Sequence, residues 1–357
     1  MDAGIDVAGV KRSFGAVHAV QQVTFRALPG RVTGLVGPNG SGKTTLMLML
    51  ASLLRPDEGE LRIGGIDPVS DPAGARRLLG WMPDSLGAWP SLTSREVLVA
   101  TAQLYDLSRE DARARAEHLL ELVDLGALAA SPARVLSRGQ KQRLALARAL
   151  VHDPRVLLLD EPASGLDPQA RIALRVLLRR LAGEGRTILI SSHVLSELEE
   201  VVDDAVFLVD GRTVGTDRVA AAATRVRVWR VRVAADAARS AEAVRLDVAA
   251  ALGRTAEEVR VDRRDILVPF SDEAGAVVGL RSLVGAGLPV AEFAPAVGDL
   301  EHAFIDLKTG PAPKKTDVPD GSTADAAEAG VSPPHGSWAP PAAADADADR
   351  TDDGSTS

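Results

Sequence analysis

The sequence predicts an α/β domain, a smaller α+β domain after it, and an unstructured tail. From Met1 to about Ala222, short apolar runs alternate with helical patterns. Apolar runs without alternation are typical of parallel strands buried on both faces of a sheet. Residues Thr224–Lys308 follow the order strand, helix, strand, strand, helix, strand, and Thr309–Ser357 consist mainly of Pro, Ala, Asp, Ser and Gly.

The first domain, residues 1–222, contains four apolar runs that predict strands and one segment with helical periodicity. The strands are expected at Val32–Val36, Val156–Leu159, Thr187–Ser191 and Val206–Val209, and the helix at Ala170–Leu181. A helix-rich insert is expected over about Asp84–Val151, because Thr93–Glu96 and Ser108–Asp111 have the spacing of a capping box. Asp210-Gly211 between short apolar runs predicts a β-hairpin.

The residues after the first of these strands form a phosphate-binding loop. The segment GPNGSGKTT satisfies the pattern G-x-x-x-x-G-K-[ST]. Its glycines let backbone N–H groups turn toward phosphate oxygens, Lys43 can reach the outer phosphates, and the Thr44 hydroxyl can bind Mg²⁺. A glycine-rich turn without a ligand is the alternative, and the strand, the Lys and the Thr together argue against it. We expect nucleoside triphosphate binding by Gly37, Pro38, Asn39, Gly40, Ser41, Gly42, Lys43, Thr44 and Thr45.

Two carboxylates follow the second predicted strand. Asp160 and Glu161 end the run VLLLDE, and ligands of parallel α/β sheets lie at the carboxyl ends of strands. Asp160 is therefore expected to hold Mg²⁺ through water, and Glu161 to orient or deprotonate the attacking water. Taken alone, the pair is equally compatible with a polar turn that ends at Pro162. The functional interpretation is favoured because the same chain contains a phosphate-binding loop.

A second helix start is a further candidate anion site. Ser137 and Gln140 have capping-box spacing in LSRGQ, and Gly139 allows close approach of a ligand. On its own, this segment favours an ordinary capped helix.

The second domain, residues 224–308, has the element order of a split βαβ, ferredoxin-like fold. Its elements are expected at Val226–Val233, Ser240–Leu252, Val259–Asp262, Ile266–Phe270, Glu273–Gly285 and Pro289–Phe293, with a last helix at Asp299–Leu307. Val226 and Val228 are even-numbered whereas Val231 and Val233 are odd, which predicts a bulge or bend near Trp229. This domain carries no chemical motif, and we expect it to have a regulatory or packing role.

Composition narrows the classes of function. Nine acidic and three basic residues lie in the tail, residues 309–357, which we expect to be disordered, so most of the net charge of −8 is there. The nearly neutral remainder has no basic patch of the kind that binds nucleic acid. There are no cysteines, the N-terminal MDAGIDVAGV lacks the pattern of a secretory signal, and no apolar run is long enough to span a bilayer.

In these motifs the chain resembles the ATP-binding cassette (ABC) ATPases over about Ile5–Gly215. Beyond the phosphate loop and the two carboxylates, four segments are similar to motifs of that family and occur in the family's order. They are the signature Leu136, Ser137, Arg138, Gly139 and Gln140, the D-loop Ser164, Gly165, Leu166 and Asp167, the switch histidine His193, and the adenine-stacking aromatic Phe14. The resemblance implies a P-loop NTPase with a RecA-like core, an antiparallel β part and a helical insert.

The resemblance also implies how the protein works. Two cassettes would pack head to tail, with ATP between the Lys43 loop of one chain and Ser137–Gln140 of the other, and His193 would contact the γ-phosphate. ATP binding would close the dimer and hydrolysis would release it.

Two residues depart from the family's pattern. Asp84 stands where the family usually has a Gln that faces Mg²⁺ and the attacking water, and its charge adds repulsion beside Asp160 and Glu161. This departure bears on how tightly transport and hydrolysis are linked. Arg138 stands where the signature commonly has a Gly, while Ser137, Gly139 and Gln140 keep the family's spacing.

The leading interpretation is the ATPase subunit of a bacterial exporter, resembling the class that pairs with ABC-2-type membrane proteins. A separate polytopic permease would form the pore, and the chain would lie on the cytoplasmic face of the membrane, with Asp84–Val97 facing the permease. A soluble ABC-type ATPase acting on ribosomes or DNA is the alternative. It is disfavoured by the single phosphate loop and the absence of a heptad run. A P-loop kinase is disfavoured because no acceptor site is evident.

Overall fold

A computed structural model of the chain describes residues 4–84, 89–215, 227–234 and 240–297. The expected helix Asp299–Leu307, the tail Thr309–Ser357 and Val226 lie outside the described residues. No helix among the described residues is long and apolar enough to cross a membrane.

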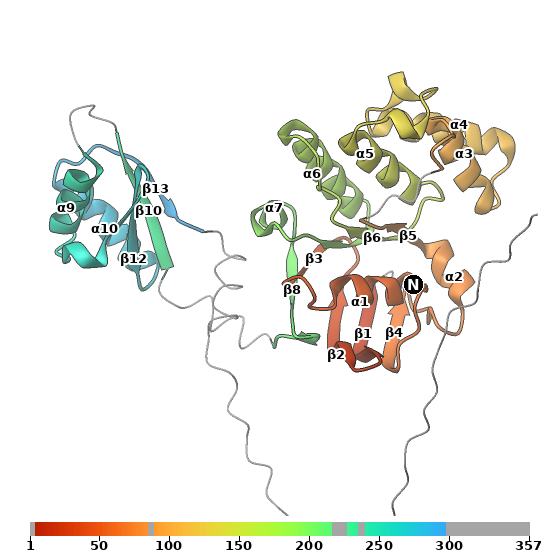
Figure 1. Cartoon of the computed structure of the whole chain (residues 1–357), viewed down its shortest axis with the longest axis horizontal. Helices are drawn as coiled ribbons and strands as arrows, with labels where there is room; N and C mark the ends of the chain where they lie inside the picture. Colours follow the sequence, from red (N-terminus) through yellow and green to blue (C-terminus); the bar gives the residue numbers. More distant parts are fainter. Residues whose placement is uncertain (1–3, 85–88, 216–226, 235–239, 298–357) are drawn as a thin grey trace, which may run out of the picture. The chain divides into compact units, whose positions relative to one another are not determined.

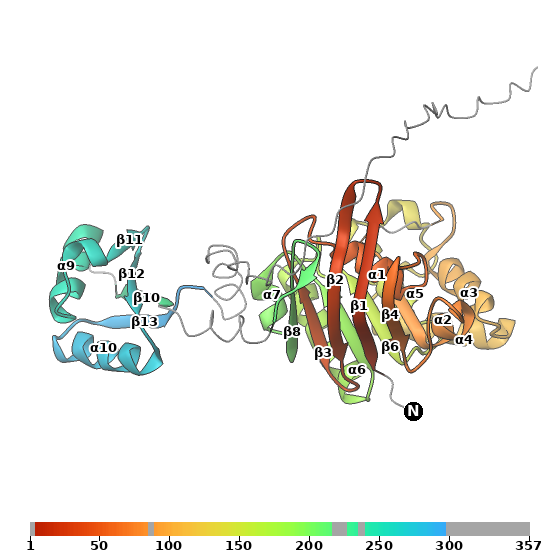
Figure 2. The same cartoon turned by 90° about the horizontal axis from the view of Figure 1, so that it is seen from below.

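Among the described residues, nine strands form one sheet in the order β4-β1-β2-β9-β8-β3-β7-β6-β5 (Figures 1 and 2). The strands β8, β3, β7, β6 and β5 are parallel to one another, and β1 pairs antiparallel with β2 and β4. Their bounds are β1 Ile5–Phe14, β2 Val17–Ala27, β3 Val32–Val36, β4 Glu58–Ile63, β5 Leu79–Met82, β6 Val156–Asp160, β7 Thr187–Ser191, β8 Asp204–Val209 and β9 Arg212–Thr213.

The helices of this part cover both faces of the parallel strands. They are α1 Lys43–Leu50, α2 Pro72–Leu78, α3 Ser94–Leu104, α4 Arg109–Leu122, α5 Arg138–Ala149, α6 Pro168–Gly183 and α7 Leu195–Glu199. Figure 1 shows α3 to α6 on one side of the parallel strands and α1, with β1, β2 and β4, on the other. The side chains of β6 alternate accordingly: Leu157 and Leu159 pack in the core of the insert helices, whereas Val156 and Leu158 pack in the core around α1.

The predicted elements of this part are confirmed with small shifts. The strands β3 and β7 have the predicted bounds, and the predicted helix Ala170–Leu181 lies within α6. Thr93 and Glu96 form a complete capping box at the start of α3. The Asp210-Gly211 hairpin is also confirmed, because both residues have positive φ and Val209 pairs with Arg212.

A second sheet of four strands follows, in the order β11-β12-β10-β13 and antiparallel throughout. That order is the one expected of a ferredoxin-like fold. Two helices pack on it, and Trp229, Phe270 and Phe293 contribute to the core. The bounds are β10 Arg227–Val233, α9 Ala241–Ala251, β11 Arg260–Asp262, β12 Asp265–Phe270, α10 Glu273–Gly285 and β13 Val290–Pro295.

The bulge expected near Trp229 is wrong. Strand β10 pairs with β12 without interruption from Arg227 to Val231, and the register shift lies further along, between Arg232 and Val233 opposite β13. The prediction failed because it counted Val228 as a core residue. Val228 is exposed, and Trp229 shares the core face with Val231 instead.

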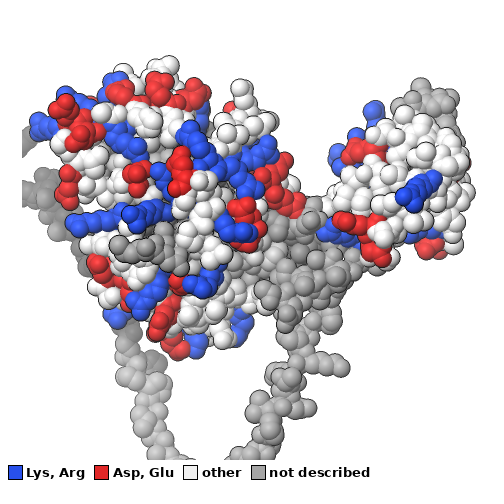
Figure 3. Space-filling view, turned by 180° about the vertical axis from the view of Figure 1, so that it is seen from behind, with Lys and Arg blue, Asp and Glu red and all other residues white. Residues whose placement is uncertain are grey.

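Acidic and basic side chains are interspersed on the face shown in Figure 3. Ion pairs between neighbouring elements include Arg175 with Glu200 and Arg179 with Asp203. This mixture is typical of a solvated protein surface.

Candidate functional site

The phosphate loop connects β3 to α1 and fits tightly between other strands. A Cβ on Gly42, which has φ 98°, would lie 2.4 Å from the Ala19 carbonyl oxygen of β2, and a Cβ on Gly37 would lie 2.5 Å from the Leu208 carbonyl oxygen of β8. Only glycine fits at both positions. The loop is thereby held with the N-terminus of α1 facing the same hollow, an arrangement that favours an anion.

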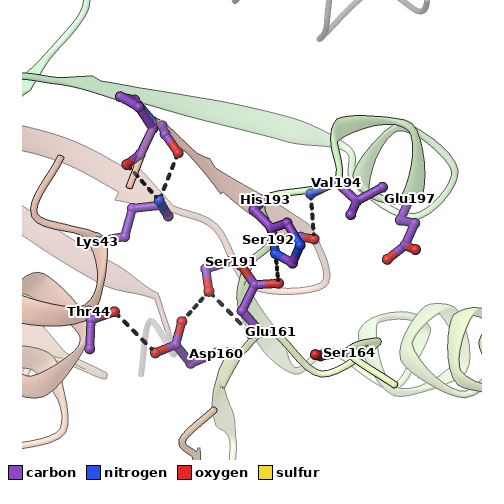
Figure 4. Close-up of polar contacts among 12 residues, drawn as sticks. Lys43, Thr44, Asp160, Glu161, Ser164, Ser191, Ser192, His193, Val194 and Glu197 are labelled. Atoms are coloured by element: carbon purple, nitrogen blue, oxygen red, sulfur yellow. Dashed lines mark hydrogen bonds and ion pairs between the residues drawn. The ribbon is translucent and has the colours of Figure 1, made fainter. Parts of the chain in front are cut away.

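Lys43 is folded over this loop. Its Nζ donates hydrogen bonds to the carbonyl oxygens of Gly37, at 2.7 Å, and Pro38, at 3.0 Å (Figure 4). Burial lowers the pKa of Lys43, and the nearby charges of Glu161 and Asp160 oppose that shift. Ser41 Oγ is buried and has no hydrogen-bond partner among the described residues. A cationic amine and an unpaired buried hydroxyl in one loop fit a ligand with several anionic oxygens.

Asp160 lies at the end of β6, opposite the start of α1. Thr44 Oγ1 donates to its Oδ2 over 3.4 Å, and Ser191 Oγ of β7 donates to its Oδ1. Burial raises the pKa of Asp160, and the charge of Asp84 adds to this effect. The hydroxyl of Thr44 and the carboxylate of Asp160 are hard oxygen ligands, which fit Mg²⁺ when water and phosphate oxygens complete its shell. Within the described ranges, no group of three or more His, Cys, Asp or Glu side chains is arranged to hold a metal.

Glu161 is held in place by contacts with three neighbouring residues. It has a positive φ of 51°, its amide donates to the Ser191 carbonyl oxygen at 3.1 Å, and Gln142 Nε2 of α5 donates to its carbonyl oxygen at 2.8 Å. Its Oε2 lies 2.8 Å from His193 Nδ1 (Figure 4). Burial raises the pKa of Glu161, while the contact with His193 opposes that shift. A carboxylate in such surroundings is a candidate general base.

The signature segment forms the capped start of α5. Ser137 Oγ accepts from the Gln140 amide at 3.2 Å, and the Gln140 side chain accepts from the Ser137 amide at 2.8 Å, which completes the capping box. Leu136 is buried in the core of the insert helices. Asp167, at the end of the D-loop, caps α6 by accepting from the Ala170 amide at 2.9 Å.

These segments surround one hollow of about 590 Å³. It is lined by Val17, His18, Ala19, Asn39, Gly40, Gly42, Lys43, Thr44, Thr45, Asp84, Arg138, Asp160, Glu161, Ser164 and His193. The structure thus brings residues of the phosphate loop, the carboxylate strand, the signature, the D-loop and the His193 segment to a single place.

Phe14 is not among the lining residues. It ends β1 with about half of its surface exposed, and the Arg12 guanidinium lies 4.8 Å from the centre of its ring. The neighbouring residues Val17, His18 and Ala19 of β2 line the hollow instead. Sequence reasoning missed these residues because it did not locate β2. It also missed Gln142, whose contact with Glu161 depends on tertiary structure.

Comparisons with known proteins agree with the motifs. The ABC transporter family model matches residues 20–164. The chain is 39% identical over 214 residues to the Nod factor export ATP-binding protein I of Paraburkholderia xenovorans (strain LB400), a match covering 60% of this chain and 70% of that protein. It is 42% identical over 204 residues to the probable multidrug ABC transporter ATP-binding protein YbhF of Escherichia coli (strain K12), covering 57% of this chain and 35% of that protein.

Solved structures with the same architecture include an ATP-binding subunit of an ABC transporter, with a TM-score of 0.56 and 29% identity, covering 60% of this chain and 91% of that chain. A bacterial ABC transporter cassette solved as a dimer has a TM-score of 0.55 and 27% identity, covering 58% of this chain and 96% of that chain. The same cassette has been solved in a post-hydrolysis state bound to ADP and Pi, with the same TM-score.

Proposed function

This chain belongs to the ABC transporter family, and we propose that it is the ATP-binding and ATP-hydrolysing subunit of an exporter whose pore is a separate membrane protein. The observation that carries the proposal is the hollow in which Lys43, Asp160, Glu161 and His193 meet. The relatives named for Nod factor export and for multidrug transport support the direction of transport.

The site residues have separate tasks in this proposal. Lys43 exchanges its two loop carbonyls for the outer phosphate oxygens of ATP, and the loop amides bind the remaining oxygens. Thr44 and Asp160 hold Mg²⁺, which neutralises charge on the phosphates. Glu161 accepts a proton from the water that attacks the γ-phosphorus, and His193 binds the γ-phosphate while keeping Glu161 in place. The products are ADP and phosphate.

A second copy of the chain completes each site in this proposal. The capped start of α5, Ser137–Gln140, binds the γ-phosphate of ATP held by the Lys43 loop of the partner. The N-terminal amides of a helix are suited to that contact. The dimeric cassette among the similar structures supports this arrangement. A two-fold arrangement of this kind gives two equivalent ATP sites.

The membrane partner is proposed to be a polytopic permease that binds at Asp84–Val97, which places the chain on the cytoplasmic face of the membrane. Trp89 is 44% exposed in this segment, and the capped start of α3 follows it. An exposed Trp next to a rigid helix is suited to a protein interface. Residues 85–88 lie outside the described residues.

The proposal is tested by co-expressing the chain with candidate polytopic membrane proteins, beginning with any that is encoded beside its gene, and measuring co-purification and ATPase activity. We expect co-purification that is lost in Trp89→Ala and kept in Leu104→Ala, an equally drastic change at an exposed apolar residue outside the segment. An ATPase whose rate no membrane protein changes would contradict the exporter assignment. Hydrolysis stimulated by RNA or DNA would favour the soluble alternative.

The division of the chain into domains is also part of the proposal. We propose that residues 1–222 form the cassette, that residues 224–308 form an accessory domain with a regulatory or packing role, and that residues 309–357 are not needed for hydrolysis.

A further inference from the structure

The helix α5 contacts the loop after β6 at two points that lie one helical turn apart. Gln142 Nε2 donates to the carbonyl oxygen of Glu161 at 2.8 Å, and Arg138 Nη2 donates to Ser164 Oγ at 2.6 Å. Residues four apart share one face of a helix, so both contacts come from the same face of α5. The loop after β6 is therefore attached to α5 through its first residue, Glu161, and again through Ser164, three residues further along the loop.

The contact at Arg138 is close as well as polar. Its Cγ, Cδ and Nε lie over Gly165, within 2.9 Å of where a Cβ would be, and Gly165 has φ 74°. On the next residue of α5, a Cβ on Gly139 would lie 3.2 Å from the Gly165 carbonyl oxygen. The Arg138 side chain at the start of α5 thus packs directly against the backbone of Gly165 in the D-loop, and little space remains between the two segments.

The two contacts differ in burial. Gln142 is 4% exposed, whereas Arg138 borders the hollow and its hydrogen bond to Ser164 is exposed. By the resemblance described above a Gly is expected at this position, and glycine has no side chain to make such a bond. The link to Ser164 is therefore a property of the arginine in this sequence.

We propose that Arg138 is a positioning residue: together with Gln142 it fixes the Glu161 loop to α5. The inference rests on the proposed function, in which the start of α5 binds the nucleotide of a second copy while Glu161 serves the nucleotide of its own chain. Arg138 then transmits contact with one nucleotide to the base that acts on the other. The role acts through Ser164 and Glu161, and Arg138 itself takes no part in proton transfer.

The first test needs neither ATP nor a partner. Two turns inside the loop, from the Ser164 amide to the Glu161 carbonyl oxygen and from the Leu166 amide to the Ala163 carbonyl oxygen, protect those amides from hydrogen exchange. Exchange at Ser164 and Leu166 is measured in the unmodified full chain, Arg138→Ala, Arg138→Lys and the control Arg134→Ala. Arg134 is an exposed arginine just before the signature.

We expect exchange at Ser164 and Leu166 to be several-fold faster in Arg138→Ala and unchanged in Arg134→Ala. Arg138→Lys restores most of the protection, because one donor suffices for the single bond to Ser164. Ser164→Ala combined with Arg138→Ala adds nothing to the effect of Arg138→Ala alone. Equal exchange rates in Arg138→Ala and the unmodified chain would overturn the proposal, whatever the ATPase does.

The second test separates positioning from nucleotide binding. For Arg138→Ala we expect kcat to fall roughly tenfold or more, the scale of a displaced catalytic group, with KM within about twofold. The Hill coefficient for ATP falls toward one, because the two sites lose their coupling. Arg134→Ala keeps both values.

The other possible outcomes of these tests separate a positioning role of Arg138 from nucleotide binding, and the contact itself from the proposed function. A rise in KM with kcat unchanged would overturn positioning and assign Arg138 to nucleotide binding. Faster exchange with kcat and Hill coefficient unchanged would also overturn it. If the unmodified chain hydrolyses no ATP while exchange responds to Arg138→Ala, the proposed function fails and the contact between Arg138 and the loop stands.

Discussion

His193 Nδ1 lies 2.8 Å from Glu161 Oε2, across the ends of two neighbouring strands (Figure 4). The parallel strands β6 and β7 pair residue by residue up to Asp160 and Ser191, so the residues that follow each strand emerge side by side. A histidine in this position can contact the carboxylate with Nδ1 and present Nε2 to an anion, and both ring nitrogens act as donors when the ring is doubly protonated. The pair is the centre of the proposed chemistry.

Replacing His193 by Ala is expected to lower kcat for ATP hydrolysis by about a hundredfold, because one preorganised contact with the transferring phosphate is lost. Nucleotide affinity should change little, since Lys43 and the loop amides remain. Steady-state kinetics and equilibrium nucleotide binding measure the two effects. His118→Ala, at an exposed residue of α4, is the matched control. A variant that hydrolyses ATP at the normal rate would remove His193 from the mechanism.

Replacing Lys43 by Ala is expected to weaken ATP binding by about a hundredfold, because the buried amine that would pair with the outer phosphates is gone. Calorimetric titration with ATP measures the loss. Lys11→Ala removes a lysine that pairs with Glu58 at the surface, and it should bind ATP normally. Unchanged affinity in Lys43→Ala would contradict the role of the loop.

His152 makes the stability of the chain sensitive to acid. Its ring stacks on Tyr105 with centroids 3.7 Å apart, and burial lowers its pKa from 6.5 to about 4. As the pH falls, His152 therefore takes up a proton in the unfolded chain before it does so in the folded chain. The free energy of unfolding decreases as the pH falls from about 6.5 toward 4. Because the ring is partly exposed, the effect is reduced. We expect His152 to contribute about 1 kcal/mol to the loss of unfolding free energy between roughly pH 7.5 and 5.

Urea unfolding of His152→Phe at both pH values tests this contribution. The loss of unfolding free energy on acidification should be smaller in the variant, whatever its absolute stability. The exposed replacement His118→Phe should keep the original loss. An equal loss in His152→Phe and the unmodified chain would show that His152 is not the group responsible.

Deleting residues 309–357 is expected to leave the ATPase rate within about twofold, because a polar, Pro-rich segment has little apolar surface with which to hold a site residue. Steady-state hydrolysis by the truncated and full chains compares them directly. A clear fall in kcat would give the tail a part in catalysis.

The sequence predicted the buried parallel strands and the helices with strong periodicity well. An uninterrupted apolar run such as Val32–Val36 is typical of a strand in a sheet covered on both faces, so these strands could be predicted from the sequence. The antiparallel strands β1 and β2 were not located, because register shifts along their pairing break the alternation of apolar and polar residues. The same breaks explain why the lining residues of β2 were missed.

The motifs located most of the lining residues, since their spacing is local. Contacts that depend on two distant segments were not predictable, as with Gln142 and the Glu161 carbonyl, or Ser191 and Asp160. Phe14 was expected at the nucleotide. In the structure its ring is about half exposed, with the Arg12 guanidinium 4.8 Å from its centre, and its contact with the nucleotide stays a prediction.

The central claim is that ATP is bound between two copies of the chain, and the mass of Glu161→Gln in solution tests it most directly. The variant keeps Lys43, Thr44 and Asp160 and loses the proposed base, so it should bind ATP without hydrolysing it. Light scattering with Mg²⁺ and excess ATP should give a dimer, and with ADP a monomer. Glu161→Gln with Ser137→Arg, which blocks the start of α5, should stay monomeric in both. A monomeric Glu161→Gln in saturating ATP would contradict the account.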